Sequence, residues 1–174
     1  MNARQGFIGQ SVVRREDARF LTGKGQYTDD IVLANMAQCY FVRSPHAHAK
    51  IRSIDKSAAL AAPGVIGILD GQDVAADKIN GLPCGWLITS TNGEPMKEPP
   101  HPILAIGKAR YVGDQVAMVI AESLVEAKNA AEAVDVDYDV LDAVVDVVDA
   151  AKGPALHDAS PDNHCFKWAI GDKS

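Results

Sequence analysis

The feature of this sequence that most constrains its fold is an unbroken apolar run at residues 116–121, which follows the dipeptide Gly113-Asp114. A short continuous apolar run bounded by a turn signal is typical of a buried strand. Directly after it, Ser123 and Glu126 have the Ser-x-x-Glu spacing of a capping box, which predicts the start of a helix. We therefore predict that the run is the middle strand of a sheet covered by that helix.

The segments on either side complete a predicted β-turn-β-α-β core in an α+β fold. Residues 103–106 and 109–112 are expected to form short arms around Gly107-Lys108. Residues 134–140 alternate between apolar and polar side chains, the pattern of a strand with one face in water. A second apolar piece, at residues 143–150, is predicted to be an edge strand that runs along the body.

Shorter elements are predicted upstream of this core. A helix near Glu16 is expected to end at Gly23, because glycine readily adopts the left-handed conformation found at helix C-termini. A second short helix is predicted at residues 58–62 with Ser57 as its cap, and Asp70 is expected to cap a turn or a third helix. Strands are predicted at residues 36–44, as a buried strand, and at residues 48–55 and 65–69.

Residues 77–102 are rich in proline and glycine and show no clear period, which predicts a long surface excursion with one short strand at residues 86–88. Loops of this length in a compact domain are usually functional, mobile or part of an interface. We divide the chain into an irregular arm with a short helix at residues 1–30, a central domain at 31–150 and a linker at 151–174.

The 174 residues carry a net charge of −6, which is unevenly distributed. Residues 1–56 hold nine Lys and Arg against five Asp and Glu, whereas the remainder holds eight against eighteen. An acidic chain is a poor candidate for nucleic-acid binding, and no apolar run is long enough to span a membrane. The start of the chain lacks the apolar region of a signal peptide. Three widely spaced cysteines argue against a disulfide framework, so we expect reduced thiols in the cytoplasm: Cys39, Cys84 and Cys165.

The histidines give a weak signal for a metal site. On a strand, His46 and His48 would share one face, so both imidazoles could meet one ion. Pro45 places His46 in a turn instead, and no third ligand stands at a recognisable spacing. Ordinary hydrogen-bonded or surface histidines are therefore favoured; the third-ligand candidates are His101, His157, His164 or an aspartate.

For the acidic and other polar residues, too, the sequence pattern favours structural roles. Adjacent Asp29 and Asp30 would point to opposite faces of an extended backbone, which favours capping over paired acid–base work. Three carboxylates on one strand face could hold a cation, but a solvent-facing strand explains them more simply: Asp135, Asp137 and Asp139. Arg110-Tyr111 could face a ligand, although an arginine at the sheet edge and a tyrosine in the core are favoured.

The sequence also gives no sign of a catalytic nucleophile or of a phosphate-binding loop. His164 and Cys165 are contiguous, which is not how a base and its nucleophile usually meet. No serine lies in a Gly-x-Ser-x-Gly elbow. The Gly23-x-Gly25 pair follows its predicted helix, whereas a nucleotide-binding loop precedes one. We accordingly predict no catalytic, cofactor-binding or metal-ligating residue in this chain.

Five blocks of the sequence, in order, resemble the N-terminal part of the large subunit of molybdenum hydroxylases, the xanthine dehydrogenase, aldehyde oxidase and aerobic carbon monoxide dehydrogenase family. The resemblance extends from about residue 9 to residue 172, and the carbon monoxide dehydrogenase-like branch is the most similar. The blocks are SVVRREDARFLTGKGQYTDDI, RSPHAHAKI, APGVIGILDGQDV, ILAIGKARYVGDQVAMVIAES and AAEAVDVDYDVLDAVVD.

This resemblance implies an α/β-hammerhead domain in a longer subunit, or one product of a subunit encoded in pieces. It implies oxidation of a small substrate, with oxygen from water, at a molybdenum–pterin cofactor, with iron–sulfur clusters and FAD on partner subunits or domains. The pterin pocket and the general base of the family lie outside this stretch, so no catalytic residue is carried over and the chain alone is expected to be inactive. Asp142 follows Leu141 where members of the family often have proline, which implies a looser turn before the next strand.

Two further expectations follow. The 77–102 excursion and the acidic C-terminal half are the predicted contact surface toward the rest of the large subunit, and apolar surface left uncovered could drive self-association. The alternative function is a stand-alone binding or interaction module that keeps the fold without enzyme activity.

Overall fold

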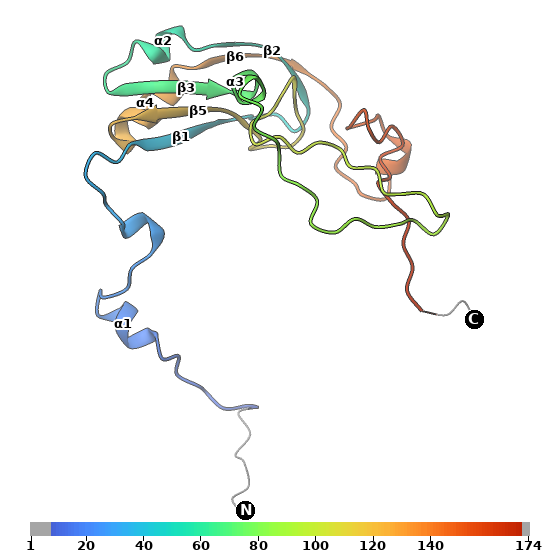
Figure 1. The fold of residues 1–174 in the computed structure, drawn as a ribbon, viewed down its shortest axis with the longest axis horizontal. Coiled ribbons are helices and arrows are strands. Elements are labelled where there is room, and N and C mark those ends of the chain that lie inside the picture. The colour runs from blue at the N-terminus through green and yellow to red at the C-terminus, as the bar shows by residue number, and fades with distance from the viewer. Residues whose placement is uncertain (1–7, 172–174) are drawn as a thin grey trace, which may run out of the picture. The chain divides into compact units, whose positions relative to one another are not determined.

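The computed structural model describes residues 8–171, which fall into two compact units, one ending at Met36 and the other beginning at Ala37 (Figure 1). The three-part division predicted from the sequence remains a proposal. The parts of the N-terminal and linker predictions that fall on residues 1–7 and 172–174 lie outside the described residues.

The first unit contains helix α1 (Asp17–Leu21) and the 3₁₀ turn η1 (Thr28–Asp30). The predicted end of α1 is confirmed, because Gly23 has a φ of +70° and its N–H donates to the carbonyl of Phe20. The Asp30 carboxylate accepts the Tyr27 N–H at 2.8 Å, which gives it a capping role. The second Gly-x-Gly residue, Gly25, packs where the Phe20 ring leaves no room for a Cβ.

The second unit is built from two three-stranded antiparallel sheets (Figure 1). The first sheet has the strand order β1 (Gln38–Arg43), β5 (Gln115–Ala121), β3 (Val65–Asp70). The second has the order β4 (Lys108–Ala109), β2 (Ala49–Asp55), β6 (Asp135–Val140). The remaining elements are the helices α2 (Ser57–Leu60), α3 (Gly71–Ala76) and α4 (Leu124–Glu132), and the 3₁₀ turn η2 (Ala150–Lys152).

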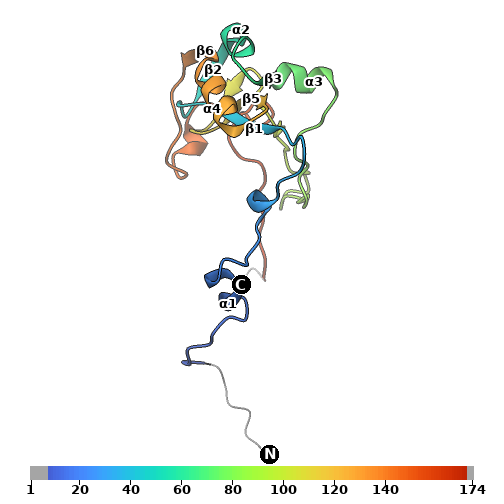
Figure 2. The same ribbon diagram turned by 90° about the vertical axis from the view of Figure 1, so that its left-hand side faces the viewer.

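The apolar run at residues 116–121 lies in β5, the middle strand of the first sheet, as predicted. Helix α4 lies against β1 and β5 of this sheet and contacts α2 (Figure 2). Its buried face consists of small side chains only, Ala127, Ala130 and Ala131, so the helix can lie close to the strands. Ala130 and Ala131 join Ala117 and Val119 of β5 in one core, against which Ile54 of β2 and Val136 of β6 also pack.

The predicted core is divided between the sheets, which corrects the sequence-based picture. Of the β-turn-β-α-β segment, β5 belongs to the first sheet, whereas β4 and β6 pair with β2 in the second. Each strand was predicted from its own pattern, but the pattern does not specify its partner. The predicted face of β6 is confirmed over residues 135–138, where Val136 and Tyr138 are partly buried and Asp135 and Asp137 are exposed. It is wrong at the end of the strand, where Asp139 is partly buried and Val140 is 61% exposed.

Four local predictions are wrong. Strand β1 is an edge strand, so Tyr40 is 42% exposed rather than buried. Ser57 does not cap α2; its N–H instead donates to the Asp55 carboxylate at 2.9 Å. No strand forms at residues 86–88, where the nearest pairing is an isolated bridge between Thr89 and Pro95. Residues 143–150 also form no strand, and three of their valines are exposed: Val145, Val147 and Val148.

The predicted capping box of α4 is half formed. The Ser123 hydroxyl accepts the Glu126 N–H at 3.3 Å, as expected for an N-cap. The Glu126 carboxylate accepts from that same hydroxyl at 2.7 Å, instead of reaching the backbone N–H of Ser123. Asp70 caps α3 as predicted, and in this case both halves of the capping box are present.

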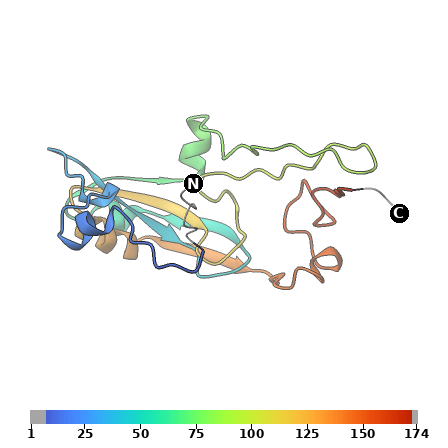
Figure 3. The same cartoon turned by 90° about the horizontal axis from the view of Figure 1, so that it is seen from below.

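The 77–102 excursion is joined by hydrogen bonds to the C-terminal segment, and both extend from the same end of the sheets (Figure 3). Backbone hydrogen bonds join Thr91 to Lys167 and Lys97 to Cys165, each at 2.8 Å. The rings of Trp86 and Trp168 meet edge to face with centroids 6.2 Å apart. Backbone groups of the excursion thus find hydrogen-bond partners in the C-terminal segment.

Candidate functional site

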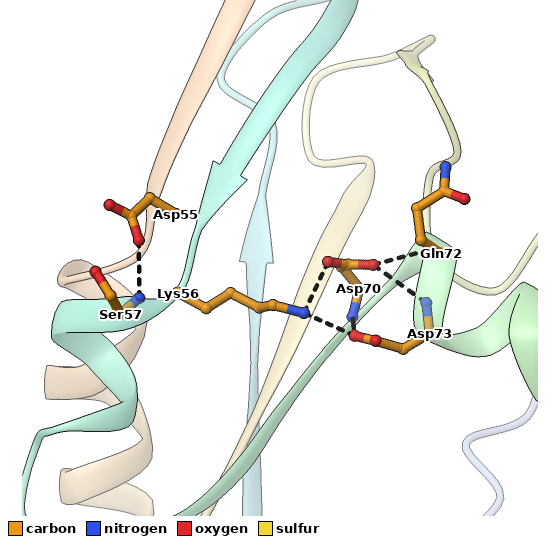
Figure 4. Close-up of polar contacts among 6 residues, drawn as sticks. All are labelled: Asp55, Lys56, Ser57, Asp70, Gln72 and Asp73. Carbon is orange, nitrogen blue, oxygen red and sulfur yellow. Dashed lines mark hydrogen bonds and ion pairs between the residues drawn. The ribbon is translucent and has the colours of Figure 1, made fainter.

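A network of three charged side chains joins the β2–α2 link to the N-terminus of α3 (Figure 4). The ammonium group of Lys56 donates to Asp70 at 2.9 Å and to Asp73 at 2.8 Å. Asp70 also accepts the N–H of Gln72, and Asp73 accepts the N–H of Asp70. Because these donors and acceptors serve one another, we assign the network to structure rather than to catalysis.

This network predicts a small acid-sensitive contribution to stability. Hydrogen bonds from Lys56 and from the Asp70 N–H lower the pKa of Asp73 below 3.8. The stabilisation is complete above that unfolded value and is lost as the pH falls through the lower folded pKa. We expect D73N to be less stable than the native chain at pH 6, with the difference shrinking toward pH 3. Because the side chain is 40% exposed, the effect should stay below about 1 kcal/mol.

Urea unfolding of both proteins at several pH values measures this difference. The matched control is D77N, which changes an exposed carboxylate at the other end of α3. If D73N lowered the free energy of unfolding by the same amount at pH 3 and pH 6, the stabilisation could not be assigned to the ionised Asp73 carboxylate.

The loop from Arg110 to Asp114 is held in one conformation between β4 and β5. The Arg110 N–H donates to the Asp114 carboxylate at 2.9 Å. Ser44, which follows β1, closes the loop from outside, since its N–H donates to Asp114 and its carbonyl accepts from Gly113, both at 2.8 Å. Gly113 has a φ of +90°, a conformation that glycine adopts without strain.

This loop forms one wall of a cavity of about 200 Å³. A second wall comes from the end of the excursion, where three prolines surround His101, and a third comes from His157 in the C-terminal segment. The lining residues are Pro99, Pro100, His101, Pro102, Ala105, Arg110, Tyr111, Asp114 and His157. The cavity thus gathers polar side chains from three separate stretches of sequence.

The structure changes the interpretation of Arg110-Tyr111. Tyr111 is 51% exposed and lines the cavity, so its predicted place in the core is wrong. Burial, followed by the nearby negative charge of Asp114, raises the pKa of Tyr111 above 10.0, so the phenol stays protonated at neutral pH. The Arg110 guanidinium donates to the carbonyls of Leu156 at 3.2 Å and Lys108 at 3.4 Å. Arg110 and Tyr111, for which structural roles were favoured from the sequence, therefore both line this cavity.

His157 is the imidazole most affected by this environment. Burial, followed by the positive charge of Arg110, lowers its pKa below 6.5. The charges of His101 and Lys108 act in the same direction, and Asp158 acts against them. The ring is consequently neutral at pH 7, and its buried Nδ1 has no hydrogen-bond partner within residues 8–171.

The other histidines predicted as metal candidates are separated in their roles. His48 is 4% exposed and its Nδ1 lies 2.9 Å from the carbonyl of Asp142. His46 lies in the bend before β2, as expected, where its ring meets Tyr138 edge to face. His164 contacts the Asp162 carbonyl through Nδ1 at 2.9 Å. Among the described residues no group of three His, Cys, Asp or Glu side chains could hold a metal ion.

The remaining candidates have ordinary surroundings. On β6, Asp139 forms an ion pair with Arg52 at 3.3 Å, while Asp135 and Asp137 are exposed. All three cysteines are free thiols, and that of Cys84 donates to the Trp86 carbonyl at 3.2 Å. No helix between residues 8 and 171 has the length and apolar character needed to cross a membrane.

The cavity was not predicted from the sequence. Its parts are a Pro-Pro-His-Pro run, an Arg-Tyr pair and one histidine of the C-terminal segment, which are far apart in the chain. The proline run beside His101 was the one local signal that could have indicated a rigid wall of a binding cavity.

Comparison with known proteins gives one family. The family model described as "Aldehyde oxidase and xanthine dehydrogenase, a/b hammerhead domain" matches residues 22–142. The carbon monoxide dehydrogenase large chain of Hydrogenophaga pseudoflava is 36% identical, with 92% of this chain and 20% of that protein covered. The nicotine 6-hydroxylase large subunit of Paenarthrobacter nicotinovorans is 37% identical, with 90% and 18% covered.

A solved structure shows the same likeness. The crystal structure of quinoline 2-oxidoreductase from Pseudomonas putida 86 superposes with a TM-score of 0.67 at 41% sequence identity, covering 84% of this chain and 18% of that chain. The chain therefore spans about a fifth of the length of the proteins it matches.

Proposed function

We propose a function from one premise: the chain belongs to the aldehyde oxidase and xanthine dehydrogenase family, as its a/b hammerhead domain. In this proposal the chain is a non-catalytic domain of the large subunit of a molybdopterin-dependent oxidoreductase, which oxidises a small substrate with oxygen from water. The observation that supports it is the family match over residues 22–142, together with relatives named as large chains or large subunits of such enzymes.

We propose that the described residues take no part in holding the molybdenum–pterin cofactor, and we assign them no step of the reaction. Within residues 8–171, the His, Cys, Asp and Glu side chains form no metal-ligand set. Gly23 and Gly25 follow α1, whereas a phosphate-binding loop precedes its helix. We propose that other parts of the large subunit hold the pterin, and that partner subunits or domains carry the iron–sulfur clusters and FAD.

The proposed role is to complete the body of the large subunit through two surfaces. One is the 77–102 excursion, on which Trp86 is 71% exposed. The other is the acidic C-terminal half, where Val145 and Val147 stand exposed between aspartates. Exposed apolar groups rimmed by polar ones are typical of interaction surfaces. Three free thiols support a reducing compartment, and we propose the cytoplasm.

An antibody raised against this chain provides the test of the enzyme assignment. Extract of cells that produce the protein is fractionated by size and by charge, and each fraction is analysed for antigen, molybdenum, iron and flavin. We expect the antigen to follow molybdenum through both separations, together with iron and flavin. Zinc is measured in the same fractions as the matched control, because the antigen should follow molybdenum and not zinc.

Antigen found in fractions without molybdenum would contradict the proposal and favour the stand-alone interaction module. The purified 174-residue chain adds an independent arm. We expect it to hold no stoichiometric molybdenum and to show no turnover of aldehydes or N-heterocycles with an artificial electron acceptor. Turnover by the chain alone would overturn the non-catalytic assignment.

A further inference from the structure

The cavity at Arg110 has the features of a small-molecule site that the hammerhead role does not require. It is formed entirely within the second unit, by the loop after β4, the proline-rich end of the excursion and His157. At about 200 Å³ it is smaller than the roughly 300–1,000 Å³ of sites for drug-sized ligands. It therefore suits a small ligand only.

The positive charge of Arg110 is the first indication of the ligand's chemistry. Among the described residues its guanidinium contacts only neutral acceptors, the carbonyls of Leu156 and Lys108, and forms no ion pair. These two bonds use Nε and one Nη and hold the planar group in place. Such a fixed guanidinium with free N–H groups matches the two oxygens of a carboxylate.

The neighbouring imidazoles add hydrogen-bonding groups to the cavity. His101 and His157 line the same cavity as Arg110, and Lys108 acts electrostatically on His157 as well. A bound anion would offset the repulsion that Arg110 and Lys108 exert on a protonated His157. The imidazoles can also donate hydrogen bonds to an anionic oxygen.

The rest of the lining selects against a fully polar anion. Pro99, Pro100 and Pro102 provide rigid apolar surface, and Ala105 adds a buried methyl group. The one acidic lining residue, Asp114, already accepts the Arg110 N–H at 2.9 Å and holds the loop. Apolar walls with a few placed polar groups are typical of sites for organic ligands.

We propose that this cavity binds a small organic monocarboxylate, whose carboxylate pairs with Arg110 and whose apolar body lies against the prolines. This site goes beyond the proposed function and does not depend on it, because all of its residues lie in this chain. Its occupation would tie the 77–102 excursion to the C-terminal segment.

Three aromatic probes of similar size and different charge test the proposal: benzoate, benzamide and benzylamine. Each is titrated into the isotope-labelled 174-residue chain, and NMR shifts of the Arg110 and His157 side chains are followed. We expect saturable shifts with benzoate, and binding weaker by about tenfold or more for the neutral and cationic probes. Benzoate should also raise the pKa of His157, because an anion favours the imidazolium.

Two variants separate charge from structure. R110Q keeps hydrogen-bond donors but removes the charge, and should weaken benzoate by about tenfold or more. R52Q removes an arginine on β2 that lies outside the cavity, and should leave benzoate binding unchanged. Benzoate is titrated up to about 50 mM, because a Kd above that concentration corresponds to less than roughly 2 kcal/mol of binding free energy. The absence of a saturable shift over this range overturns the proposal. Equal binding of benzoate and benzamide, or unaltered binding by R110Q, overturns it too, and the probe comparison stands even if R110Q fails to fold.

Discussion

Replacement of Val119 by aspartate is expected to leave this chain unfolded in water. Val119 lies in β5 with no exposed surface, paired with Tyr40 of β1 and Ile68 of β3. It belongs to the core shared with α4 and the second sheet. Burial of an unpaired carboxylate costs several kcal/mol, a large part of the roughly 5–15 kcal/mol that stabilises a domain. The variant cannot move the charge to water without separating β5 from its neighbours.

The matched control is V145D, which introduces the same charge at a side chain that is 90% exposed. Its free energy of unfolding should change by no more than about 0.5 kcal/mol. Circular dichroism and urea unfolding of both variants measure the contrast. V119A adds a graded step, since loss of two buried methyl groups should cost about 2 kcal/mol or more. A V119D protein that unfolds cooperatively at the native midpoint would contradict the placement of the core.

The contrast between Val119 and Val145 also shows what the sequence can predict. Both valines lie in apolar stretches, and both stretches were predicted to be strands. The first is bounded by a turn and followed by a capped helix, so neighbouring signals agree on one structure. The second has no such neighbours, and its side chains Val145, Val147 and Val148 stay exposed. Local pattern thus predicted β5 and α4 correctly, whereas residues 143–150 were assigned on composition alone.

Pairing between strands was the part of the fold that local pattern could not supply. The alternation in β6 predicted which side chains are exposed as far as Tyr138, but β6 pairs with β2, whose partner residues lie 80 to 91 positions earlier in the chain. Hydrophobic alternation specifies a face and leaves the neighbouring strand open. The cavity could not be predicted from local pattern for the same reason, because His101, Arg110 and His157 come together only in the folded chain. Asp70 was predicted correctly because an N-cap depends on residues within one turn.

Substitution of Gly71 by alanine is the second change for which we expect a large effect. Gly71 begins α3 and is buried against the segment that leads to β4. A Cβ at this position would lie 2.5 Å from the carbonyl oxygen of Ala105 and 2.8 Å from a side-chain carbon of Ile106. Ala105 cannot retreat freely, because its N–H donates to the Gln115 carbonyl at 2.7 Å. We expect destabilisation by about 1–3 kcal/mol, despite the better helix propensity of alanine.

The matched control for this change is G67A, in β3 of the first sheet, where no heavy atom lies within 4 Å of the added Cβ. Alanine there lowers the entropy of the unfolded chain and should stabilise by up to about 1 kcal/mol. The two glycine variants are therefore expected to shift the urea midpoint in opposite directions. Because Ala105 also lines the Arg110 cavity, G71A should displace that wall and change the NMR shifts of Tyr111, whereas G67A should not. Equal stability of the two variants would mean that the close approach of α3 to Ala105 does not constrain the fold.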